Sequence, residues 1–171
     1  MIGERIYLRL LEPEDTDRCA RWINDPEVNY GLISEQLHFN RVREREWIDG
    51  LYRDDTSITF GICLKADGRH IGNIGLNLID RVSRTAHFGI LIGEKDEWGK
   101  GYATEATKLV VEYAFNVQNL QRVELVVFEF NERAHACYKK AGFVEEGRLR
   151  RKRYKRGKYY DEILMAILRD E

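Results

Sequence analysis

The stretch Trp98-Gly99-Lys100-Gly101-Tyr102-Ala103-Thr104 says most about the fold of this chain. The apolar run of residues 88–93, typical of a strand, precedes it, and an apolar-periodic segment that predicts a helix over about 104–116 follows. Two glycines let bare backbone come close to a ligand. The free N–H groups at the start of a helix favour an anion, and Lys100 adds a positive charge. The stretch therefore predicts a cradle for a pyrophosphate.

Two other phosphate-binding motifs do not fit this stretch. A P-loop has four residues between its glycines and a Ser or Thr after the lysine, whereas here five residues separate Gly93 from Gly99, and Gly101 follows Lys100. The dinucleotide fingerprint G-x-G-x-x-G fails because Thr104 stands where the third glycine belongs. A tight glycine turn that binds nothing is the alternative that remains.

The composition of the whole chain is that of an ordinary globular protein. Its 171 residues, 43% apolar and 33% charged, predict one domain over residues 1–171. No apolar run approaches the roughly 20 residues of a membrane span, and the first residues lack a signal-peptide profile. Cys19, Cys63 and Cys137 are odd in number and far apart, which favours neither disulfides nor a metal site. We expect a cytoplasmic protein without a membrane partner.

Charge is unevenly distributed along the chain, although the net charge is −1. Residues 1–55 are rich in Asp and Glu, whereas residues 148–158 are almost entirely basic. The basic segment is either a surface for an anionic partner such as nucleic acid, or the solvated face of an edge hairpin whose Lys and Arg prevent edge-to-edge pairing. We favour the edge hairpin and expect no nucleic-acid partner.

Apolar periodicity and turn residues predict an α+β chain around one central sheet. The predicted strands are residues 6–11, 57–64, 70–79, 86–93, 122–130, 148–154 and 159–168. The predicted helices are residues 13–24, 41–53, about 104–116, and one that starts at Asn131 and that Gly142 ends. The expected apolar contacts of helix 41–53 are Val42, Trp47, Ile48 and Leu51, and residues 29–40 are expected to form a loop.

A second group of functional candidates follows the strand 122–130. The motif reads Asn131-x-x-Ala134-x-x-x-Tyr138-x-Lys140-x-Gly142-Phe143. Asn is a favoured helix N-cap, and the seven residues from Asn131 to Tyr138 make two helical turns, so both project from one face. Taken alone, Tyr138 is a core aromatic residue whose hydroxyl is satisfied by a neighbour. Its position beside the end of a central strand also makes it a candidate site residue.

Taken together, the apolar strand, W-G-K-G-Y-A-T-E-A, the buried strand and N-x-x-A-x-x-x-Y-x-K-x-G-F resemble the GNAT superfamily of acyl-CoA-dependent N-acetyltransferases. The opening residues 3–9 and Trp22-x-Asn24-Asp25-Pro26 are similar to the branch of ribosomal-protein N-terminal and spermidine acetyltransferases. The resemblance covers essentially the full length. It implies a single GNAT-like domain: a twisted, mostly antiparallel sheet of about seven strands, splayed at the cofactor site, with about four helices around it.

The resemblance also implies a role for each matching residue. The phosphate signature falls on Trp98, Gly99, Lys100, Gly101, Tyr102, Ala103 and Thr104, with Trp98 where Gln or Arg usually stands. Leu91, Ile92 and Gly93 match the strand that pairs with the pantetheine arm, and Asn131 matches a cofactor-contacting Asn. Tyr138 matches the Tyr that faces the thioester sulfur. The implied cofactor is acetyl-CoA, and no metal is expected.

The implied reaction is acetyl transfer to a primary amine by direct attack in a ternary complex. An ammonium must first lose its proton, and Tyr138 is expected to supply a proton to the leaving thiolate. Many relatives carry Glu where this chain has His87, and histidine titrates near neutral pH, so His87 is a candidate base. Its alternatives are a structural role for His87, with Glu94, Glu124 or water taking the proton. Cys137 is expected to be buried rather than acylated, because adjacent helical residues diverge by about 100°.

The expected acceptor is a peptide N-terminus, such as that of a ribosomal protein, or a small amine such as a polyamine or an amino sugar. Two other function classes stay open. One is an acyl-CoA sensor without turnover, which the retained Tyr138 argues against. The other is a ribosome- or nucleic-acid-associated protein that uses residues 148–158. A homo-oligomer also stays open.

Overall fold

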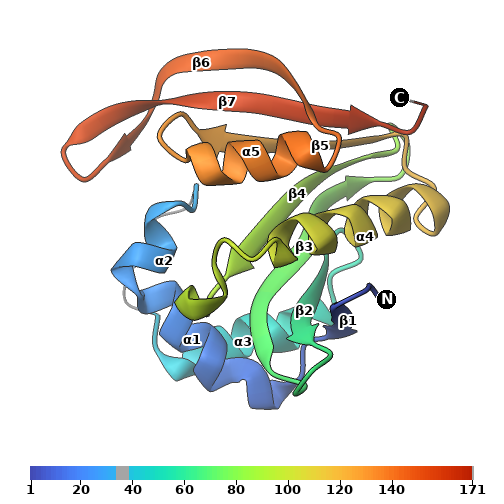
Figure 1. Ribbon diagram of the computed structural model, residues 1–171, viewed down its shortest axis with the longest axis vertical. Coiled ribbons are helices and arrows are strands. Elements are labelled where there is room, and N and C mark those ends of the chain that lie inside the picture. Colours follow the sequence, from blue (N-terminus) through green and yellow to red (C-terminus); the bar gives the residue numbers. More distant parts are fainter. Residues whose placement is uncertain (34–38, 171) are drawn as a thin grey trace.

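A seven-stranded mixed sheet forms the centre of the computed structural model, which describes residues 1–33 and 39–170 (Figure 1). The sheet order is β1-β2-β3-β4-β5-β7-β6, and β4 and β5 are the parallel pair in an otherwise antiparallel sheet. The strands are β1 (Ile6–Leu10), β2 (Ile58–Leu64), β3 (His70–Asp80), β4 (Thr85–Ile92), β5 (Arg122–Phe128), β6 (Val144–Lys155) and β7 (Lys158–Leu168). The helices are α1 (Thr16–Asn24), α2 (Pro26–Tyr30), α3 (Arg41–Leu51), α4 (Tyr102–Asn116) and α5 (Glu132–Lys140), with short 3₁₀ turns η1 (Pro13–Asp15) and η2 (Lys95–Glu97).

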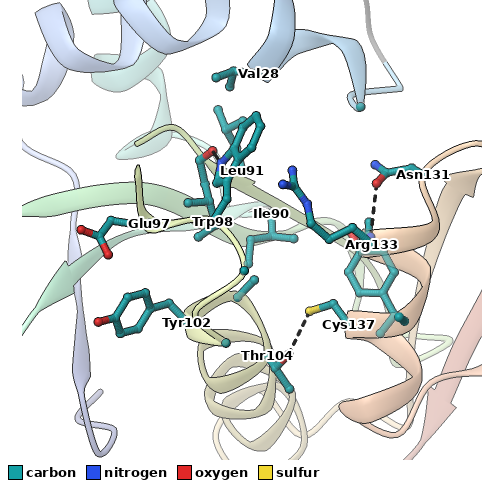
Figure 2. Close-up of a pocket in the computed structure, with 18 of the residues that line it drawn as sticks. Val28, Ile90, Leu91, Glu97, Trp98, Tyr102, Thr104, Asn131, Arg133 and Cys137 are labelled. Carbon is teal, nitrogen blue, oxygen red and sulfur yellow. Dashed lines mark hydrogen bonds between the residues drawn. The ribbon is translucent and has the colours of Figure 1, made fainter. Parts of the chain in front are cut away.

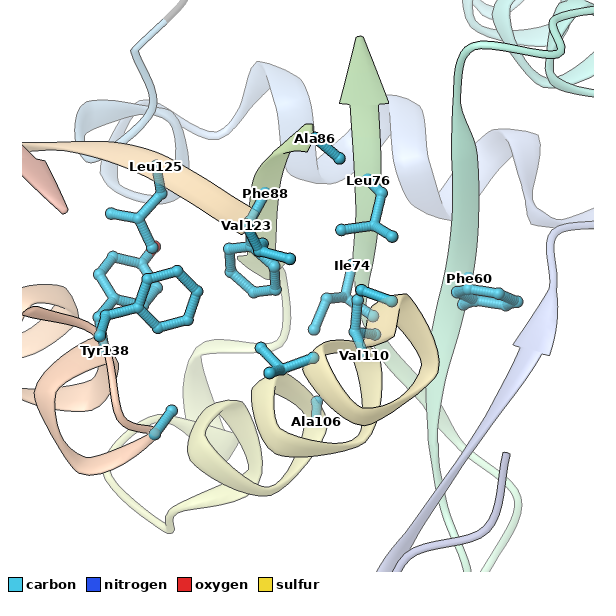
Figure 3. Close-up of a cluster of buried hydrophobic side chains, with 14 of the residues drawn as sticks. Phe60, Ile74, Leu76, Ala86, Phe88, Ala106, Val110, Val123, Leu125 and Tyr138 are labelled. Atoms are coloured by element: carbon cyan, nitrogen blue, oxygen red, sulfur yellow. The ribbon is translucent and has the colours of Figure 1, made fainter. Parts of the chain in front are cut away.

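Helix α4 packs its apolar side on the centre of the sheet. Ala106 and Val110 of α4 lie against Ile74 and Leu76 of β3 in the main hydrophobic cluster (Figure 3). Side chains alternate along a strand, and on the opposite face of β3 Asn73 donates a hydrogen bond to Sγ of Cys19 on α1. Residues of α1 and α3 line a pocket on this face together with residues of β3 and β4. The two faces of β3 and β4 therefore meet different helices, and this separation defines two environments around the same strands.

The sheet opens between β4 and β5. The two strands pair only through Thr85–Arg122, Ala86–Val123 and His87–Glu124, although β4 continues to Ile92 and β5 to Phe128. The splay implied by the family resemblance is present. Backbone N–H and C=O groups that face the gap have no ladder partner across it, and buried backbone groups of this kind need another hydrogen-bonding partner.

The first third of the chain differs from the predicted elements. The predicted helix 13–24 is η1 followed by α1, and Asp25-Pro26 ends it as expected. The same dipeptide starts α2, a helix that was not predicted. The Asp25 carboxylate accepts hydrogen bonds from the first-turn N–H groups, and Pro26 occupies the first helical position. Part of the expected loop 29–40 is therefore helical, and residues 34–38 lie outside the described residues.

Helix α3 buries a different set of side chains from the predicted one. Ile48 is buried as expected, but Val42 and Trp47 are 65% and 40% exposed. Glu44 is only 5% exposed and takes part of the buried face instead. Carboxylates are almost never fully buried without a partner, so a reason other than packing is required for Glu44.

The basic segment 148–158 forms most of the edge strand β6 and the turn into β7, as the edge-hairpin interpretation predicts. The tip of this hairpin docks on the region of α2. The ammonium of Lys155 is buried and donates hydrogen bonds to the carbonyl oxygens of Asn29, 3.2 Å away, and Leu32, 2.8 Å away. No helix in the described residues has the length and apolar character needed to span a membrane.

Candidate active site

A pocket of about 310 Å³ lies where β4 leaves β5 (Figure 2). Its wall comes from the end of β4, the turn before α4, the first turn of α4, and helices α5 and α2. The predicted site residues that line it are Leu91, Ile92, Trp98, Gly99, Gly101, Tyr102, Ala103, Thr104, Asn131 and Tyr138. Three predicted site residues, Gly93, Lys100 and His87, are not among those that line it.

The glycine turn and the start of α4 form an anion-binding cradle. Gly99 and Gly101 have φ values of +79° and +86°, the left-handed region that favours glycine. Gly101 is the N-cap of α4, so no side chain caps its first N–H groups, whereas side chains cap α2, α3 and α5. These N–H groups belong to lining residues of the pocket, and the helix dipole adds to their positive potential. This end of the pocket therefore has the features of an anion-binding site.

The positive side chains that line the pocket are Arg133 and Lys140, and Lys100 is not among them. The ammonium of Lys100 binds Oε2 of Glu97 at 2.9 Å, so the charge expected at the phosphate site is taken up by a nearly buried carboxylate. Arg133 on α5 lines the pocket and places its guanidinium 4.0 Å from the ring centroid of Trp98 (Figure 2). No sequence motif indicated Arg133, because its proximity to Trp98 exists only after α5 packs beside the turn.

Trp98 and Gly93 have structural roles at the end of β4. The indole Nε1 of Trp98 donates a hydrogen bond to the carbonyl oxygen of Ile92 at 2.8 Å, which fixes the turn to the strand. A Cβ on Gly93 would lie 2.0 Å from the ring of Trp22, so this glycine makes room for a buried tryptophan. Leu91 and Ile92 line the pocket and Gly93 does not, so the pairing of Gly93 with the cofactor stays a prediction.

Tyr138 and Cys137 both line the pocket from α5. Tyr138 is 8% exposed, packs edge-on against Phe88, and has no hydrogen bond from its hydroxyl within the described residues. Burial raises the pKa of Tyr138, so its phenol stays protonated at neutral pH. Cys137 is half-buried, and its Sγ lies 3.3 Å from Oγ1 of Thr104 (Figure 2). The expectation of a buried Cys137 was wrong, because the pocket is wide enough for two adjacent residues of α5 to line it.

The residues proposed as proton acceptors are engaged elsewhere. His87 places Nε2 2.8 Å from Oε1 of Glu124, and Glu124 also accepts a hydrogen bond from Arg122 at 2.8 Å. The carboxylate of Glu94 binds Arg21 and the indole of Trp22. None of His87, Glu94 and Glu124 is among the described residues that line the pocket.

A second pocket, of about 360 Å³, adjoins the first on the face covered by α1 and α3. The two pockets share Leu32, Ile90 and Leu91, so they meet at β4 beside the splay. The other residues that line the second pocket are Cys19, Ile23, Phe39, Glu44, Trp47, Thr59, Asn73, Ile74, Gly75, Asn77 and Gly89. One pocket can therefore hold a phosphate-bearing molecule while the other holds a second reactant against the same stretch of strand.

A splayed parallel pair, a glycine cradle at a helix start and a tyrosine facing the gap define an acyl-CoA-binding class of fold. The chain belongs to the GNAT acetyltransferases, since residues 5–144 match the family model described as Acetyltransferase (GNAT) domain.

Several relatives agree with this assignment along nearly the whole chain. The spermidine N(1)-acetyltransferase of Escherichia coli (strain K12) is 38% identical over 97% of this chain and 87% of its own. YdaF of Bacillus subtilis (strain 168), provisionally named a ribosomal N-acetyltransferase, is 33% identical over 99% of this chain and 94% of its own. Among solved structures, the spermidine N-acetyltransferase from Vibrio cholerae in complex with CoA and spermine is 26% identical, with a TM-score of 0.91 over 97% of this chain and 96% of that one. The protein is an acetyl-CoA-dependent N-acetyltransferase.

Proposed function

We propose that residues 1–171 act as one domain that moves the acetyl group of acetyl-CoA to a primary amine by direct attack in a ternary complex. The observation that carries this proposal is the meeting of the two pockets at Ile90 and Leu91. An amine held in the second pocket reaches the same strand as an acyl group held in the first. Direct transfer needs no acyl-enzyme intermediate, because both reactants are held close together.

The residues of the first pocket suit each part of acetyl-CoA, which supplies an acetyl group activated as a thioester. The uncapped N–H groups of α4 and the guanidinium of Arg133 would hold the phosphates. The unpaired edge of β4 at Leu91 and Ile92 would bind the pantetheine arm, beside Asn131. Tyr138 would donate a proton to the sulfur as the carbon–sulfur bond breaks, because its phenol is protonated and its hydroxyl is free of protein partners within the described residues.

The acceptor is proposed to be a small amine such as a polyamine, or a peptide N-terminus. Both types occur in the names of relatives that match along nearly the whole chain. His87 remains a candidate proton acceptor, and it would act through water because it does not line either pocket within the described residues. A dodecamer of the Vibrio cholerae spermidine acetyltransferase supports a homo-oligomer here. The free thiols of Cys19, Cys63 and Cys137 support a cytoplasmic location.

The test is coenzyme A release from acetyl-CoA with a panel of acceptors: spermidine, amino sugars, and peptides with free Ala or Ser N-termini. We expect turnover with one class of primary amine and none with the matching N-acetylated compounds. Tight acetyl-CoA binding without turnover on any member would instead favour an acyl-CoA sensor.

A further inference from the structure

Glu44 is a buried carboxylate without an ion pair or a side-chain hydrogen bond among the described residues. It lies in the first turn of α3, is 5% exposed, and lines the second pocket. Its own N–H is used within the helix start, where it donates to the carbonyl oxygen of Asn40 at 3.1 Å. A buried carboxylate costs stability unless a partner compensates for its lost hydration. Glu44 is therefore poised for a cation that comes from outside the chain.

Other buried acidic residues of this chain form ion pairs. Asp15 binds Arg9 at 2.7 Å, Glu162 binds Arg153 at 2.8 Å, and Glu97 binds Lys100. All three are as well buried as Glu44, and each has its own cation. Glu44 differs from these three structural carboxylates because no cationic side chain among the described residues pairs with it.

The surroundings of Glu44 suit an ammonium with an apolar body. Among the described residues that line the second pocket, Cys19 is the one other ionisable group, and burial raises the pKa of its thiol to about 11, so it is neutral. Ile23, Leu32 and Trp47 add apolar surface around the carboxylate. A cation that enters the pocket therefore meets one negative charge.

We propose that Glu44 binds the reacting ammonium of the acceptor and accepts its proton before the amine attacks. This inference rests on the proposed acetyl transfer. The ammonium N–H bond breaks and the proton passes to the Glu44 carboxylate, which leaves a neutral amine. The amine nitrogen then forms the new bond to the acetyl carbon while the carbon–sulfur bond breaks and Tyr138 gives its proton to the coenzyme A thiolate. The nitrogen loses its second proton as the amide forms, and this proton restores the Tyr138 phenol. The proton on Glu44 is released to solvent after the product leaves. The substrate class is a primary amine whose reacting ammonium is carried on an apolar body.

The protonation behaviour of Glu44 is consistent with this role. Burial raises its pKa to about 6, so the group is ionised at neutral pH yet basic enough to accept a proton. The charged groups on neighbouring elements are already paired: Asp15 in η1 with Arg9, and Asp17 on α1 with Arg41 of α3. On β3, the neighbouring side chain that lines the pocket is the uncharged Asn73.

The test compares Glu44→Gln with the wild-type protein, using an acceptor amine that the panel identifies. The substitution keeps size and removes the negative charge. We expect kcat/KM to fall by roughly 10²-fold or more, and the rise in rate near pH 6 to disappear. Calorimetric binding of the amine to the protein with coenzyme A present, where no reaction occurs, should weaken at least tenfold. Affinity for acetyl-CoA should be unchanged.

Glu46→Gln is the matched control, because Glu46 lies on the same helix but is exposed and does not line the second pocket within the described residues. It should leave all three measurements as in the wild type. Normal amine binding and an unaltered pH profile in Glu44→Gln would overturn the role of Glu44 while leaving the proposed function intact. Absence of turnover in the wild-type protein with every amine would instead count against the proposed function.

Discussion

The imidazole Nε2 of His87 lies 2.8 Å from Oε1 of Glu124, and these two residues are the last pair that joins β4 to β5. Each is a candidate proton acceptor by sequence, yet the fold binds them to each other where the strands separate. Arg122 extends the group through Glu124 and Glu146. The pair therefore links the two strands at the closed end of the splay, on the edge away from the cradle.

His87→Ala tests whether this pair also handles the substrate proton. Because His87 does not line either pocket within the described residues, we expect the rising limb of the pH–rate profile to persist. Stability should drop by less than about 1 kcal/mol, as for a partly exposed ion pair. The pH dependence of kcat/KM is the measurement, and a flattened limb would show that His87 takes the proton through water.

Tyr138→Phe should lower kcat by about 10²-fold and leave the affinity for acetyl-CoA nearly unchanged, because only the proton donor is removed. Single-turnover rates and calorimetry separate the two effects. Tyr154→Phe serves as the control, since Tyr154 is 61% exposed on β6. Equal turnover of Tyr138→Phe and wild type would remove Tyr138 from the mechanism.

Gly101→Val should abolish acetyl-CoA binding. Its φ of +86° is unfavourable for a branched residue, so the substitution would distort the start of α4, where the phosphates are proposed to bind, and its Cβ would lie 3.3 Å from Nη2 of Arg5. Gly68→Val is the matched control, because Gly68 has a φ of +74° in a turn remote from the pocket. Both variants should lose stability, and binding by calorimetry should fail in Gly101→Val alone. Retained affinity in that variant would exclude the cradle as the phosphate site.

Arg133→Ala should weaken acetyl-CoA binding by roughly three- to tenfold, with a smaller effect at high salt, because an exposed guanidinium is screened. Lys139→Ala, on the same helix but outside the lining residues within the described chain, should have no effect. Dissociation constants at two ionic strengths provide the comparison. The same loss in both variants would mean that general charge, rather than the position of Arg133, attracts the cofactor.

Glu44→Gln should stabilise the protein at neutral pH. The folded-state pKa of Glu44, about 6, exceeds the ordinary value of 4.5, so its favourable contribution is present below about pH 4.5 and is lost as the pH rises through 6. Above pH 6 the ionised group costs up to about 2 kcal/mol. Thermal unfolding should give a higher Tm for the variant at pH 7.5 and an equal one at pH 4. A lower Tm at pH 7.5 would mean that the ionised carboxylate stabilises the fold.

The sequence predicted the elements whose signals are local. The strands of the sheet and the glycine turn before α4 depend on periodicity and turn residues, and the structure contains them. The start of α2 was missed because Asp25-Pro26 both ends one helix and caps the next. Arg133 and Glu44 could not be predicted, because their roles arise from α5 beside the cradle and α3 beneath β4. Lys100 is the opposite case. The motif predicted that its ammonium binds a phosphate, but in the structure the ammonium is paired with the carboxylate of Glu97.

The splay between β4 and β5 also bears on the order in which substrates bind and products are released. Residues of α4 and α5 line the first pocket, and residues of α1 and α3 line the second, with Ile90 and Leu91 shared between them. In the proposed ternary complex, neither reactant would have to pass the other to enter or leave. Such a two-sided passage permits random-order binding, and the acetylated amine can depart while coenzyme A is still bound.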